Sequence, residues 1–130
     1  MNARDLAEMA GAYVDCALWA GLDWSAVEDR GVGNPVPLDE GYGPGDVTPA
    51  ALTAIEAECE AFADANMADL AEVGSWAQHG HDFYLTRNGH GAGFWDRGYG
   101  EAGVRLSAAA KACGEAEPDP VGDGTLAAGP

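Results

Sequence analysis

The stretch HDFYLTRNGHGAGFWDRG, residues 81–98, decides how the fold is predicted, because apolar, charged and glycine positions are interleaved there more densely than elsewhere in the chain. If residues 81–87 form a strand, one of its faces presents His81, Phe83, Leu85 and Arg87, and the other presents Asp82, Tyr84 and Thr86. Residues 88–93 are rich in glycine, and residues 94–96 bring aromatic side chains again. The pattern predicts a β-hairpin over residues 81–97 with an enlarged glycine-rich tip.

The arginines of this hairpin need acidic partners if they are buried, because an unpaired guanidinium is costly to remove from water. Arg87 with Asp96, or Arg97 with Asp82, would form such a pair across the two strands. The stretch is therefore interpreted chiefly as a structural signature of the fold.

Helical patterns surround the hairpin. Residues 3–20 follow an asparagine that can cap a helix, residues 48–74 begin with a Thr-Pro pair, and residues 101–113 end before a glycine. Apolar residues recur in each segment at spacings of three and four. The predicted class is α+β, with about three helices packed on a small antiparallel sheet and the β-hairpin 81–97 at its centre.

Glycine and proline mark two irregular segments. Residues 21–47 contain both at high density and are predicted to form a long loop on the domain surface. Residues 115–130 are rich in proline, glycine and acids and have little to bury. We therefore predict a single globular domain over residues 1–114, followed by a flexible acidic tail over residues 115–130.

The net charge of -16 is strongly asymmetric, since residues 1–72 contain fifteen acidic residues and two basic ones. Such a field repels nucleic acid and anionic membranes and attracts basic protein surfaces. Solubility, or adaptation to a salty host, is the alternative reason for the charge. The three cysteines are far apart, which favours a reduced, cytosolic protein over a disulfide framework. No apolar run approaches the roughly 20 residues that cross a membrane.

An acidic ridge is predicted on the second helix. Glu56, Glu60 and Asp64 are four residues apart, so their carboxylates lie about 5–6 Å from each other on one face. That spacing is similar to the spacing of phosphates along a nucleic-acid strand. We predict this face, with three neighbouring acids, to be a partner-binding surface, although a merely solvated face is the alternative. The neighbouring acids are Glu58, Asp69 and Glu72.

The central stretch also offers candidate ligand chemistry. Three histidines could bind a metal, but their spacing matches no known zinc pattern. The glycine-rich loop lacks the lysine and the following helix of phosphate-binding loops. No nucleophile has a convincing base partner. The sequence therefore predicts no enzyme activity, no cofactor and no metal. The alternative is a small-ligand site in the glycine-rich loop. Its residues would be Arg87, Asn88, His90 and Arg97.

The run GHDFYLTRNGHGAGFWDRG resembles the hallmark segment of a group of small tailed-phage proteins. YVDCALW at residues 13–19 and EAECEAFADAN at residues 56–66 extend the resemblance, which covers about residues 8–114. Relatives continue with an aromatic, strand-like segment, whereas this chain has prolines and glycine at that point. The resemblance implies a phage protein made in the host cytoplasm, and it carries over no catalytic residue.

These observations predict a phage-encoded acidic inhibitor that binds a host or phage protein with a basic surface. The expected target is a nucleic-acid-handling complex of a host antiviral system, of the restriction or CRISPR type, blocked by imitation of nucleic acid. The protein itself is expected not to bind nucleic acid or membranes. A protein that sequesters a nucleotide or metal, and a structural or regulatory accessory protein, are the alternatives.

Overall fold

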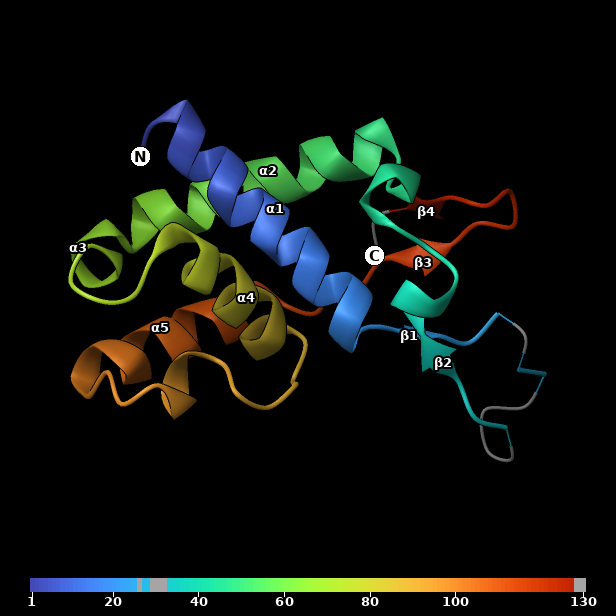
Figure 1. The fold of residues 1–130 in the computed structure, drawn as a ribbon. Helices are drawn as coiled ribbons and strands as arrows, with labels where there is room; N and C mark the ends of the chain where they lie inside the picture. Colours follow the sequence, from blue (N-terminus) through green and yellow to red (C-terminus); the bar gives the residue numbers. More distant parts are fainter. Residues whose placement is uncertain (26, 29–32, 128–130) are drawn as a thin grey trace.

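The structure, a computed structural model, describes every residue except 26, 29–32 and 128–130. Its described part is α+β, as predicted for the class, with helices making up most of the fold (Figure 1). The helices are α1 Ala3–Ala20, α2 Pro49–Ala65, α3 Met67–Leu70, α4 Trp76–Arg87 and α5 Glu101–Ala112. Short 3-10 turns are η1 Leu38–Glu40, η2 Pro44–Asp46 and η3 Phe94–Asp96.

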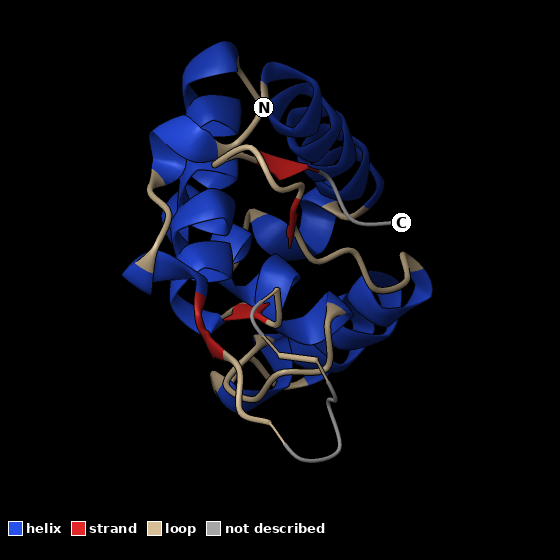
Figure 2. Cartoon of the chain, turned by 90° about the vertical axis from the view of Figure 1, so that its right-hand side faces the viewer, coloured by secondary structure: helices blue, strands red, loops and turns tan. Residues whose placement is uncertain are grey.

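Two separate pairs of very short strands lie at one side of the helices, the side that faces the viewer in Figure 2. β1 Leu22–Asp23 pairs antiparallel with β2 Val36–Pro37. β3 Asp119–Pro120 pairs antiparallel with β4 Leu126–Ala127. Neither pair is the central sheet that the sequence predicted, so the helices pack on each other and not on a sheet.

Helix starts follow the predicted signals closely. The Asn2 side chain accepts a hydrogen bond of 2.8 Å from the backbone N–H of Asp5, and Asp5 completes a capping box at the start of α1. Thr48 caps α2, and Pro49 is its first residue. The predicted helix over residues 48–74 ends earlier, because Asn66 caps α2 and starts the short α3.

The predicted β-hairpin over residues 81–97 is wrong, because residues 76–87 form the helix α4. Its start signal lies before the quoted stretch, where the Ser75 side chain accepts a hydrogen bond from the N–H of Gln78. Residues 82–88 are all buried, with polar and apolar side chains alike inside the protein. A helix buried on every side has no polar face, so the sequence shows no 3.6-residue periodicity and the local alternation imitates a strand.

α4 is the central element of the fold, and α1 packs against it at close range (Figure 1). Gly80 of α4 makes this close approach possible, since a Cβ atom there would overlap the carbonyl oxygen of Met9. The core is aromatic: the rings of Phe62 and Phe83 stack at 4.3 Å, and Tyr13 contacts Phe83 at 5.7 Å between centroids. Thus α4 holds α1 on one side and α2 on another.

The described part of the predicted tail, residues 115–127, lies against the domain. Leu126 is fully buried, and its carbonyl oxygen accepts a hydrogen bond of 3.0 Å from the N–H of Thr48. The hydroxyl of Tyr13 donates to the carbonyl oxygen of Ala116. These contacts add the segment to the core beside the start of α2. No helix in the described ranges is long and apolar enough to cross a membrane.

Candidate partner-binding surface

The outward face of α2 contains the predicted acidic ridge, which we define as Glu56, Glu60 and Asp64. Glu60 and Asp64 are exposed, and Glu56 is partly buried. Among the described residues, neither Glu60 nor Asp64 has a hydrogen-bond or ion-pair partner. Their carboxylates are therefore available to a partner without loss of an internal contact.

The three neighbouring acids of the predicted surface differ from the ridge. The exposed carboxylate of Glu58 pairs with the guanidinium of Arg87. Asp69 accepts two hydrogen bonds from Arg105, at 2.7 and 2.9 Å. Glu72 is exposed beside them. Glu58 and Asp69 thus contribute to internal ion pairs, which the sequence could not reveal because their partners lie 29 and 36 positions away.

Arg87 is buried at the junction of α2, α4 and the end of α5, with only 4% of its surface exposed. Besides its pair with Glu58, its Nε donates to the carbonyl oxygen of Gly114 at 2.8 Å and its guanidinium lies 5.0 Å from the Phe83 ring centre. Burial acts to lower the pKa of Arg87, but Glu58 and Tyr13 more than offset it, so the pKa is raised. The predicted pair with Asp96 is therefore replaced by one with Glu58.

Asn88 and His90, at the end of α4, hold the following segments in place. The Asn88 side chain accepts a hydrogen bond of 2.7 Å from the N–H of Ala116. Glu117 accepts from the Tyr84 hydroxyl at 2.9 Å and lies 2.8 Å from Nε2 of His90. Burial and the Glu117 carboxylate raise the pKa of Tyr84, so its hydroxyl remains a donor.

The predicted pair of Arg97 with Asp82 is confirmed, with a distance of 2.9 Å from the guanidinium to the buried carboxylate. Burial raises the pKa of Asp82, and Arg97 and Gln78 offset part of this effect. His79 is buried beside it, its Nε2 lies 3.0 Å from the carbonyl oxygen of Leu70, and burial lowers its pKa. A neutral His79 ring therefore donates to that carbonyl.

The four residues of the alternative ligand site already have polar contacts within the fold. Arg87, Asn88 and Arg97 form hydrogen bonds or ion pairs with other parts of the chain, and His90 contacts Glu117. Nor do the histidines gather with other ligating side chains: the described residues contain no group of three or more that could hold a metal ion.

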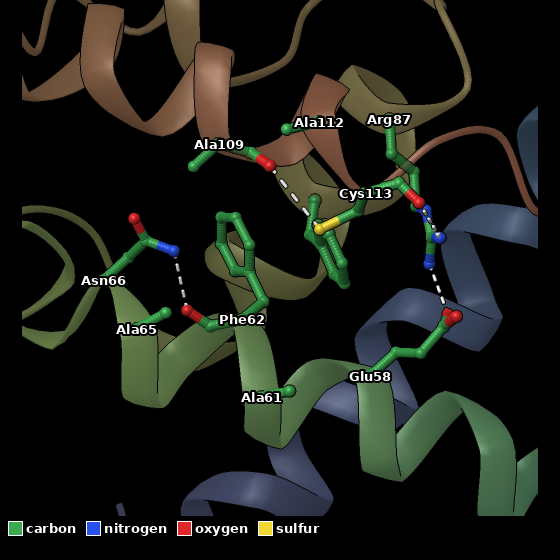
Figure 3. Close-up of a pocket in the computed structure, with 10 residues that line it drawn as sticks. Glu58, Ala61, Phe62, Ala65, Asn66, Arg87, Ala109, Ala112 and Cys113 are labelled. Atoms are coloured by element: carbon green, nitrogen blue, oxygen red, sulfur yellow. Dashed lines mark hydrogen bonds and ion pairs between the residues drawn. The ribbon is translucent and has the colours of Figure 1, made fainter.

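A groove that sequence reasoning missed lies between α2 and α5, with α4 as its floor (Figure 3). Its cavity volume is about 490 Å³, within the range of about 300–1,000 Å³ typical of ligand pockets. Its alanines are spaced four residues apart on α2 and three apart on α5, a pattern too common in helices to have predicted a groove. The lining residues are Glu58, Ala61, Phe62, Ala65, Asn66, Phe83, Arg87, Ala109, Ala112 and Cys113.

Comparison of the chain with protein-family models, with curated proteins and with solved structures finds no match. The resemblance to small tailed-phage proteins therefore stays a prediction.

Proposed function

We propose that this protein is a phage-encoded acidic inhibitor that binds the basic nucleic-acid groove of a host antiviral complex. The observation that carries the proposal is the pair of exposed, unpartnered carboxylates of Glu60 and Asp64 in a chain of net charge -16. Like charges four apart on a helix destabilise it slightly. Among the described residues, no basic side chain pairs with these two carboxylates. This arrangement favours a surface whose charge is neutralised by a basic partner protein.

The alternative small-ligand site in the loop after α4 receives less support. An anion bound there would compete with Glu58 and Asp82 for the guanidinium groups of Arg87 and Arg97. Because Asp82 is fully buried, separation from Arg97 would leave its carboxylate without its main compensating charge. The fold thus uses these groups for its own stability.

A plaque assay tests the proposed function directly. Bacterial strains that each carry one restriction or CRISPR-type system are challenged with a targeted phage, with and without expression of the protein. We expect plaque formation to recover in at least one defended strain and to be unchanged in the strain without a system. If no defended strain in a panel covering both types shows recovery, the proposal is wrong.

A charge-matched pair of variants tests the role of the ridge. E60Q/D64Q removes two exposed carboxylates from α2, whereas D39N/E40Q removes two exposed carboxylates from η1. We expect only E60Q/D64Q to weaken binding to the purified defence complex. Affinity should also fall as salt rises from about 0.1 to 1 M, because the Debye length falls from about 10 to about 3 Å. Equal effects of both variants would refute a specific ridge.

A further inference from the structure

The acidic ridge explains attraction to a basic partner but not tight binding. Charges at the rim of an interface set the association rate and the salt dependence more than the affinity. The free energy of binding is concentrated in a few well-packed side chains, often aromatic, that fill pockets. An apolar pocket would therefore add affinity that the exposed ridge does not supply.

The groove between α2 and α5 has the shape of such a pocket. Its walls are alanines, which leave the space between the two helices unfilled, and its floor includes the stacked rings of Phe62 and Phe83. Its lining on α2 runs from Glu58 to Asn66, so the groove is about 12 Å long at the helical rise of about 1.5 Å per residue. That length accommodates about two turns of another helix.

The exposed charged group in this groove is the carboxylate of Glu58, which also pairs with Arg87. Glu58 and Arg87 are the charged residues of the lining, and they lie at the same end (Figure 3). The Glu58 side chain is 47% exposed and the Arg87 side chain only 2%, so the carboxylate faces the occupant. An apolar segment with a lysine or arginine beside it complements this arrangement.

We infer that the groove binds an amphipathic helix of the partner protein, with apolar side chains on the aromatic floor and a basic side chain at Glu58. This is the helix-in-groove mode, in which anchors about one turn apart provide the affinity. The inference rests on the proposed function, because it identifies how the basic partner is held.

The probe is a fluorescent leucine–lysine peptide of about 14 residues, which is long enough to span the groove as a helix and places leucines on one face. A control peptide has serine at every leucine position and the same charge. In the protein, A61L fills the groove without changing charge, and A57L places the same side chain on an exposed position of α2 outside the groove. Binding is measured by fluorescence anisotropy.

We expect the leucine–lysine peptide to bind the wild-type protein and A57L equally, and A61L to weaken binding about tenfold or more. The serine peptide should bind far more weakly to all three proteins. The thiol of Cys113 provides a second measurement, since it lines the groove and is exposed whereas Cys16 and Cys59 are buried. Bound peptide should slow alkylation of Cys113 in the wild-type protein and not in A61L.

Equal affinity of A61L and A57L, or equal binding of both peptides, overturns the inference. It is also overturned if the wild-type protein dimerises and A61L is monomeric, because the groove then holds a second copy of the chain. The proposed function is judged separately. If A61L restores plaques as well as the wild-type protein does, the groove has no role in inhibition, but the proposed function stands. If the peptide binds the groove but the protein restores no plaques, the groove binds helices and the proposed function is wrong.

Discussion

The close packing of α1 against α4 leads to two glycine-to-alanine substitutions that should change stability in opposite directions. Gly80 and Gly11 both lie inside helices with ordinary backbone conformations. In an unobstructed helix, alanine is more stable than glycine by about 0.5–1 kcal/mol. Gly11 meets this condition, because a Cβ atom there has no atom within 4 Å. We expect G11A to stabilise the protein by about that amount.

G80A should destabilise the protein instead. A Cβ atom at Gly80 would overlap the carbonyl oxygen of Met9 and lie 3.1 Å from the Cβ atom of Ala12 and 3.0 Å from the backbone nitrogen of Tyr13. The first obstacle is backbone, so the helices must separate. A gap of about 0.5–1 Å forfeits a quarter to a half of the dispersion energy of the affected contacts. Overpacking costs about 1–3 kcal/mol, and an obstacle made of backbone places G80A near the upper end of that range. After subtraction of the gain of about 0.5–1 kcal/mol from alanine in a helix, we expect a net loss of about 2 kcal/mol.

Urea unfolding, followed by circular dichroism, measures both effects. The midpoint should rise in G11A and fall in G80A, with unchanged dependence of the free energy of unfolding on urea. A loss of about 2 kcal/mol is large against the total of about 5–15 kcal/mol expected for a domain. The reasoning is refuted if G80A unfolds within about 0.5 kcal/mol of the wild type, because α1 and α4 then do not meet at Gly80.

Three further predictions concern the polar contacts of α4. R87L should lower the free energy of unfolding by about 3 kcal/mol in urea titrations, because Glu58 and the backbone carbonyl groups after α5 lose their hydrogen-bond donor. A change below about 0.5 kcal/mol would show that the hydrogen bonds of Arg87 do not stabilise the fold. The pKa of His79 is lowered in the fold, so protonation favours the unfolded chain. Wild-type stability should therefore fall below about pH 6.5, by up to about 1.4 kcal/mol per pH unit, and H79Q should lose this dependence. E117A removes the acceptor of Tyr84 and should accelerate hydrogen exchange in residues 115–127 by about tenfold; unchanged exchange would show that Leu126 alone holds the segment.

The elements with exposed faces were predictable from the sequence, and the central one was not. α1 and α5 start and end near the predicted positions, and α2 starts at the predicted Thr-Pro pair, because a cap, a Thr-Pro pair or a glycine marks these termini and one face of each helix is polar. The end of α2 at Ala65 was not predicted. α4 has no polar face that contrasts with an apolar one, since its polar residues His79, Asp82 and Arg87 are buried. Each of them contacts a residue outside α4. These polar side chains can be buried because they bind partners elsewhere in the chain. The local pattern of polar and apolar residues does not reveal such partners.

Local sequence patterns also predicted only part of the candidate site. The position of the ridge could be predicted, because Glu56, Glu60 and Asp64 are four residues apart on one helix. The groove could not, because it depends on how far apart α2 and α5 lie. Arg87 donates to the carboxylate of Glu58 on α2 and to the backbone carbonyl that follows α5, so one side chain links both walls at one end of the groove. Of the four residues predicted as a ligand site, Arg87 therefore helps to shape the groove. The motif is a structural signature that contributes Phe83 and Arg87 to the lining of the groove between α2 and α5.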